Sequence, residues 1–249
     1  MTLGPNTWSL ARAAKIAGAA YLITSATSFS NLYFSSRLAV PGDFARTAAN
    51  IAANAQLFRV MILFELVTCL GCVVLNVALY ELLAPVHRSL ARLAAFFRIA
   101  ESAVYGAITV NAVVFLSILT GADFARALQP LELQALARAF RSAHSNGFTM
   151  AMVFLSLGSA VYMYLLIRSR YVPNALAVAG IVMSVLGAVF FLARLAFPEF
   201  VATTFAAVRG LPTAALALLA VIALPFLAFE VILGLWLLVR GIRIPERET

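Results

Sequence analysis

Apolar residues dominate six long stretches of this chain, and each stretch is long enough to cross a lipid bilayer. A membrane-spanning helix needs about 20 mostly apolar residues, because the hydrocarbon core of a bilayer is about 30 Å thick. The pattern therefore predicts an all-α integral membrane protein, a bundle of six transmembrane helices that forms a single domain over residues 1–249. The expected spans are residues 16–33, 60–83, 93–119, 148–167, 176–196 and 212–239.

The connections between the spans alternate in character. Those after the second and fourth spans are short and basic, whereas those after the first, third and fifth are longer and amphipathic. Short amphipathic helices are expected in the long connections, near residues 44–51, 130–141 and 200–208. They would lie at the outer face of the membrane, where they would either pack against lipid headgroups or form a lid.

Composition and charge fit a membrane protein and exclude other classes. Hydrophobic residues make up 63% of the chain, charged residues 11%, and the mean hydropathy is +0.99, which excludes an ordinary soluble domain. The net charge of +8 does not indicate nucleic-acid binding, because Lys and Arg are scattered at the ends of apolar stretches. They are denser at the two chain ends and in the short connections, which predicts that both termini are cytoplasmic. The lipid bilayer is the expected partner.

Two opposite charges lie deep within the third span. Arg98 and Glu101 are three residues apart, and Tyr105 follows one turn later on the same helix face. A charge near the bilayer centre costs at least about 2.5 kcal/mol, so this face should point toward protein or a wet cavity. The couple is either part of a functional site or a structural ion pair that orients the helix during assembly.

A polar stripe runs along the second span. Glu65, Cys69, Cys72 and Asn76 follow helical spacing and share one face, which should also point inward. This stripe is either part of a polar cavity or a seam between helices. The two cysteines form a C-x-x-C pattern, but a position in the middle of a span supplies neither an accessible thiolate nor a redox partner.

The sixth span holds a third deep acid, Glu230, ten residues before Arg240. Pro225 is expected to kink this helix and to leave the carbonyl of Val221 without its usual partner. We expect Glu230 to line a cavity at this kink. A cluster of the three deep acids around Arg98 would leave at least one acid without a compensating charge, which suits a bound proton or a cationic molecule. The candidate residues for a polar cavity are Arg98, Glu101, Tyr105, Glu65, Asn76 and Glu230.

Four segments resemble one known family. They are residues 52–59, residues 78–88 with the sequence ALYELLAPVHR, residues 97–101 with FRIAE, and residues 168–173 with RSRYVP. In this order they resemble the bacterial multi-pass membrane family named domain of unknown function 4386. The resemblance implies a six-span protein of the bacterial inner (cytoplasmic) membrane. It carries no established activity, ligand or cofactor.

The sequence leaves three classes of function open. The first is binding or transport of a small hydrophobic or cationic molecule through a polar cavity. The second is a non-enzymatic membrane scaffold or sensor component, and the third is an intramembrane enzyme that acts on a lipid through paired carboxylates. No catalytic or metal-binding residues and no cofactor are expected, because His87 belongs to an inner turn, His144 to an outer segment, and no phosphate-binding loop is present. The sequence contains no signal for a particular oligomeric state.

Overall fold

The computed structural model describes residues 8–123, 128–199 and 224–243. These residues form helices and no strand, which confirms the all-α prediction. In chain order the elements are α1 (Leu10–Leu38), α2 (Phe44–Ala53), α3 (Ala55–Leu83), α4 (Arg88–Leu119), α5 (Pro130–Ser169), α6 (Asn174–Ala196), α9 (Leu224–Leu235) and the π-helix η3 (Trp236–Arg240).

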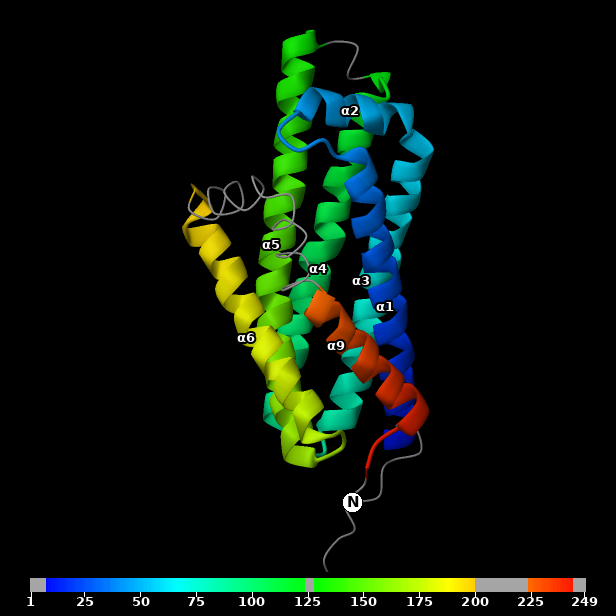
Figure 1. Ribbon diagram of the computed structural model, residues 1–249, viewed down its shortest axis with the longest axis vertical. Helices are drawn as coiled ribbons and strands as arrows, with labels where there is room; N and C mark the ends of the chain where they lie inside the picture. The colour runs from blue at the N-terminus through cyan, green and yellow to red at the C-terminus, as the bar shows by residue number, and fades with distance from the viewer. Residues whose placement is uncertain (1–7, 124–127, 200–223, 244–249) are drawn as a thin grey trace, which may run out of the picture.

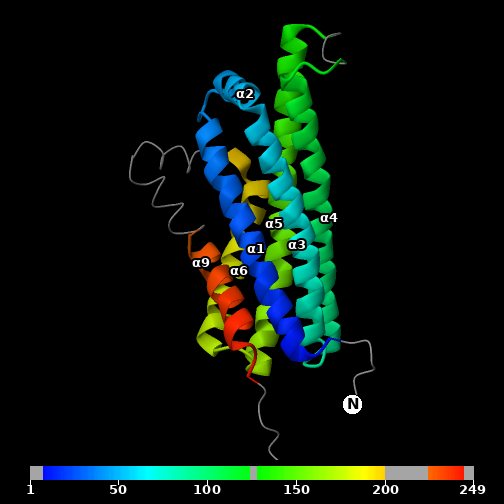
Figure 2. The same cartoon turned by 90° about the vertical axis from the view of Figure 1, so that its right-hand side faces the viewer.

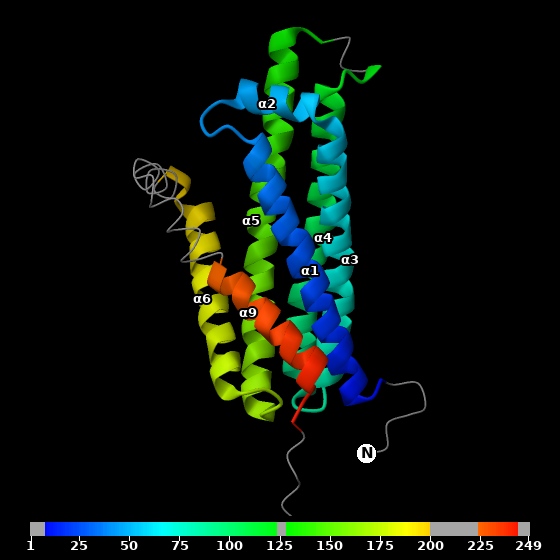
Figure 3. The same ribbon diagram turned by 45° about the vertical axis from the view of Figure 1, so that its right-hand side comes forward.

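The long helices run up and down beside one another in an elongated bundle. Figure 1 shows α2 lying across one end of this bundle, which we call the α2 end. The first residues of α1 and the last residues of η3 lie at the opposite end, which we call the termini end (Figure 2). In the view of Figure 3, α9 crosses in front of the bundle between α6 and α1. Consecutive long helices therefore run in opposite directions along the bundle, and their polar residues lie on helices packed side by side.

Four helices are long and apolar enough to cross a membrane. They are α3, α4, α5 and α6. The outward face of α3 carries large apolar side chains in free contact with the surroundings, such as Leu63 and Leu70, each 58% exposed. An exposed apolar surface of this extent is costly in water and favourable in lipid. The protein is a multi-pass membrane protein.

The first and sixth predicted spans differ from these four. The α1 helix has 29 residues and runs beside α3, but its serine, threonine and asparagine residues make it less apolar than the four. Of the predicted span 212–239, the structure describes the part from Leu224 onward, with Pro225 in the first turn of α9. Val221 lies outside the described residues, as does the predicted amphipathic helix at residues 200–208.

One prediction about the third connection is wrong. The amphipathic segment 130–141 and the span 148–167 do not form two helices, because α5 continues through both from Pro130 to Ser169. Proline suits the first turn of a helix, and a capping box between Gln129 and Glu132 satisfies the free backbone groups there. His144 therefore lies within this long helix and not in a separate outer segment.

The amphipathic helix predicted near residues 44–51 is present as α2. Asp43 caps its first turn by accepting a hydrogen bond from the backbone N–H of Arg46 at 2.9 Å. Thr47 and Ile51 are buried on its inner face, whereas its other face is largely exposed. Packing of Phe44 and Phe58 around Phe115 of α4 fixes α2 across the end of the bundle.

Candidate functional site

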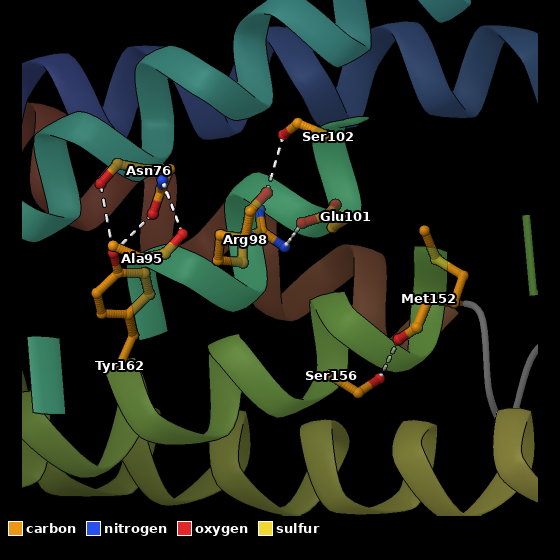
Figure 4. Close-up of polar contacts among 8 residues, drawn as sticks. All are labelled: Asn76, Ala95, Arg98, Glu101, Ser102, Met152, Ser156 and Tyr162. Atoms are coloured by element: carbon orange, nitrogen blue, oxygen red, sulfur yellow. Dashed lines mark hydrogen bonds and ion pairs between the residues drawn. The ribbon is translucent and has the colours of Figure 1, made fainter. Parts of the chain in front are cut away.

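Arg98 and Glu101 form an ion pair inside the bundle, one turn apart on α4. The distance from Arg98 Nη1 to Glu101 Oε2 is 2.7 Å, and both side chains are almost completely buried. Figure 4 shows the two side chains meeting on the inner face of the helix. Within the described residues, neither of these two atoms makes a well-aligned hydrogen bond. The pair is therefore held by charge attraction, and each side chain neutralises the buried charge of the other.

A glycine on α5 makes room for the arginine. A Cβ atom at Gly158 would lie 2.8 Å from Cγ of Arg98 and 3.1 Å from the backbone oxygen of Ala94. These distances are shorter than ordinary contacts between carbon and its neighbours, so a larger residue here would displace the arginine stem or the helix. Gly158 thus lets α4 and α5 approach closely at the level of the ion pair.

Glu230 approaches the same region from α9. The hydroxyl of Ser25 on α1 donates a hydrogen bond to Glu230 Oε2 at 3.3 Å. The charge of Arg98 attracts Glu230 as well as Glu101, and the two acids repel each other. Tyr21, one turn before Ser25, is buried within the electrostatic reach of Arg98 and Glu230. We call Arg98, Glu101 and Glu230 the inner cluster.

The inner cluster has more acid than base. The guanidinium of Arg98 pairs with Glu101 and attracts Glu230 electrostatically, so these three groups carry one surplus negative charge when both acids are ionised. An uncompensated buried charge is strongly unfavourable in a low-dielectric interior. Binding one proton or one monovalent cation would neutralise it. This chemical property distinguishes the inner cluster from a simple structural ion pair.

Asn76 connects three helices next to this cluster. Its side-chain N–H donates to the backbone oxygen of Ala95 on α4 at 3.3 Å, and its Oδ1 accepts a hydrogen bond of 2.7 Å from the hydroxyl of Tyr162 on α5. Both Asn76 and Tyr162 are buried. The arrangement in Figure 4 is that of a helix–helix seam, one of the two interpretations of the polar stripe on the second span.

Removing the Tyr162 hydroxyl should weaken this seam. In Tyr162→Phe, Asn76 Oδ1 loses its hydrogen bond in a buried position, and we expect the free energy of unfolding to fall by about 1–2 kcal/mol. The measurement is unfolding of the purified protein in detergent. Tyr164→Phe is the matched control, because the Tyr164 side chain on the same helix is 45% exposed. Equal stability of the two variants would contradict a structural role for the Tyr162 hydroxyl.

Glu65 lies apart from the inner cluster. His144 Nε2 on α5 is 3.1 Å from Glu65 Oε1 and 3.2 Å from Oε2. From helix rise, Glu65 lies about 27 Å from the termini end of α3, whereas Arg98 lies about 15 Å from that end of α4. The three deep acids therefore form two sites at different levels of the bundle, not a single group.

Tyr105 lies between these two levels. It is one turn beyond Glu101 on α4, and its ring packs edge-to-face on Phe148 of α5 with centroids 6.1 Å apart. Phe148 is itself one turn beyond His144. The carboxylates of Glu65 and Glu101 both act electrostatically on the Tyr105 hydroxyl. Tyr105 is thus the candidate residue that faces both sites.

Two hollows of the described surface lie away from these charged residues. One of about 320 Å³ lies between α2, α4 and α5 at the α2 end, where Phe44, Ile118 and Leu133 contribute to its apolar lining. None of the six candidate polar residues lines it. The candidate site is therefore defined by its buried charges.

Four residues that sequence reasoning did not select belong to these sites: Tyr21, Ser25, Tyr162 and His144. Tyr21 and Ser25 share a face of α1 with Gly18, and Tyr162 follows Gly158 by one turn on α5. A small residue followed by a polar one at helical spacing is a signal that could have indicated these faces. The sequence pattern predicts a separate outer segment around His144, and a residue in such a segment would not be expected to pair with Glu65.

Comparison with known families bears on this arrangement. The family described as domain of unknown function 4386 matches residues 16–241, which include every candidate residue. The chain belongs to the domain of unknown function 4386 family. Comparison with curated proteins and comparison with solved structures each gave no match. For this member of the 4386 family, function must therefore be inferred from the chemistry of its own buried residues.

Proposed function

We propose that this protein binds a small hydrophobic or cationic molecule within the membrane and carries it across, with the inner cluster as the binding site. The observation that carries the proposal is the surplus acid: Glu101 and Glu230 share a single guanidinium, that of Arg98. Helix packing alone needs no surplus charge, and a matched ion pair would serve it better. A site that exchanges a proton for a cation needs one more acid than base.

The proposal includes a topology. In it, α1 and residues 212–239 complete a bundle of six spans with the four apolar helices, both termini are cytoplasmic, and the protein lies in the inner membrane. The up-and-down course of the helices supports an even number of crossings, since the two ends of the described chain lie at the same end of the bundle. The density of Lys and Arg near the termini supports the orientation.

A lipophilic cation tests the proposal. We expect tetraphenylphosphonium to bind the purified protein in lipid nanodiscs and to release about one proton per cation bound at neutral pH. In Glu230→Gln the surplus charge is lost, and the affinity should fall at least about tenfold, or about 1.4 kcal/mol. Calorimetric titration in two buffers of different ionisation heat measures both the affinity and the proton count.

The control is Glu81→Gln. Glu81 lies near the termini end of α3, two residues before that helix ends, and is not part of the inner cluster. Its substitution removes the same charge from the protein and should leave the affinity unchanged. Binding that is equally strong in both variants, or that releases no proton, would contradict the proposed site.

The alternative is a non-enzymatic scaffold or sensor component. The observation that favours it is the Asn76 seam, in which buried polar groups of three helices satisfy one another. In that case tetraphenylphosphonium would not bind, and the variants Glu230→Gln and Tyr162→Phe would affect stability alone. The same titration therefore separates the two functions.

A further inference from the structure

The Glu65–His144 pair is a second polar site, at a level of the bundle different from that of the inner cluster. It joins α3 to α5, and its side chains are only partly buried, with 16% of Glu65 and 27% of His144 exposed. Both carboxylate oxygens lie within 3.2 Å of the same ring nitrogen, so the imidazole is centred on the acid. In an apolar environment this contact is stabilising, because placing either group there without the other would cost free energy.

The charged and titratable groups around this pair come from three further positions. Tyr105 faces it from α4, and Arg194 of α6 donates a hydrogen bond of 2.8 Å to Ser145, the residue after His144. Arg141 lies three residues before His144 on α5 and is partly buried. Among the described residues, the basic side chain paired with Glu65 is that of His144.

Histidine makes the charge of this site variable. Imidazole gains or loses a proton near neutral pH, unlike any other ordinary side chain. Starting from a neutral imidazole and a carboxylate, the pair carries one negative charge. With one added proton, on either group, the pair is neutral overall, and with a second added proton it carries one positive charge. The site can therefore take up a proton without leaving a large uncompensated charge.

We propose that the Glu65–His144 pair is a proton-binding site that exchanges with the outer solution, and that Tyr105 connects it to the inner cluster. The connection rests on the proposed function, in which the inner cluster holds a proton in place of the cation. Tyr105 is placed for this role because it lies one turn beyond Glu101 on α4, and its ring packs on Phe148, one turn beyond His144 on α5. In the proposed topology the pair lies on the outer side of the inner cluster.

The transfer involves only N–H and O–H bonds. A proton from the outer solution binds to the imidazole of His144, which passes one proton to the Glu65 carboxylate. The Tyr105 oxygen accepts this proton and releases its own hydroxyl proton to Glu101. His144, Glu65 and Tyr105 return to their starting forms, and one proton has moved to the inner cluster. With Glu101 protonated, Arg98 compensates Glu230, and the surplus charge is gone.

Histidine NMR tests the outer site directly. The chain has two histidines, so a protein with His87→Gln and ¹⁵N-labelled histidine gives the signal of His144 alone. In nanodiscs this signal should change from the imidazole to the imidazolium pattern between about pH 5 and 8. The midpoint should move by at least about half a pH unit in Glu65→Gln and stay in place in Glu81→Gln. A His144 signal that keeps one form throughout, or that titrates identically in both variants, would overturn the site.

The link through Tyr105 has its own measurement. Glu230→Gln should shift the His144 midpoint when Tyr105 is present and should leave it unchanged in the Tyr105→Phe background, with Tyr164→Phe as the control background. A shift that survives Tyr105→Phe overturns the link.

Tetraphenylphosphonium binding is measured separately on the same samples. Intact binding without a titrating His144 overturns this inference alone, and a titrating His144 without binding overturns the proposed function and leaves the proton site standing.

Discussion

Arg98→Ala should be the most destabilising single substitution among the buried polar residues of this protein, with a loss of about 3–5 kcal/mol in the free energy of unfolding. The substitution removes the only cation of the inner cluster among the described residues and leaves Glu101 and Glu230 facing each other without compensation. It also leaves an unfilled space beside Gly158, where the arginine stem packs. Unfolding in detergent, followed by circular dichroism, measures the loss.

Two further variants separate the charge from the packing. Arg98→Ala combined with Glu101→Gln should recover part of the loss, because the unpaired acid is replaced by a neutral amide of the same size. Arg92→Ala is the control, since Arg92 lies on the same helix and is exposed. Effects of Arg98→Ala and Glu101→Gln that simply add would refute the pairing, as would a loss equal to that of Arg92→Ala.

Gly18→Ala should separate α9 and η3 from α1. A Cβ atom at Gly18 would lie 2.6 Å from the backbone oxygen of Gly234 and 2.6 Å from the backbone nitrogen of Leu238. Backbone atoms within a helix cannot shift locally to relieve a clash, as the end of a flexible side chain can, so the helices must move apart. We expect a loss of about 1–3 kcal/mol in the free energy of unfolding, measured in detergent. Because Glu230 is one turn before Gly234, tetraphenylphosphonium affinity should fall as well.

Gly106→Ala is the matched control for this prediction. It adds the same methyl group to a glycine within α4, where the new Cβ would lie 3.5 Å from Cys69 Sγ, an ordinary contact distance. Its stability should change little. If Gly18→Ala were as stable as Gly106→Ala, the close crossing of α1 and α9 would not be a determinant of the fold.

The sequence predicted the features that depend on a single helix. The four apolar helices agree with the predicted spans, because length and hydropathy within one segment decide whether it can cross a bilayer. The Arg98–Glu101 pair was also accessible, since residues three apart on a helix lie next to each other whatever surrounds them. Its burial followed from the cost of a charge in lipid.

The continuity of α5 is where reasoning from pattern failed. The change from an amphipathic to an apolar pattern near residues 142–147 predicts a break between two helices. No proline interrupts this segment, and two of its polar side chains have partners on other helices: Glu65 for His144 and Arg194 for Ser145. Polar residues that are satisfied by neighbours no longer require a water-exposed connection.

By itself, the sequence determined that this is a helical membrane protein with charges buried on inward faces, because hydropathy and helical period act locally along the chain. Only the tertiary structure decided which groups meet: Glu65 with His144, Ser25 with Glu230, and Gly18 with Gly234. These contacts join residues that are far apart in sequence, and they depend on the order and crossing of the helices. Local periodicity specifies which face of a helix points inward, but it does not specify which other helix that face packs against.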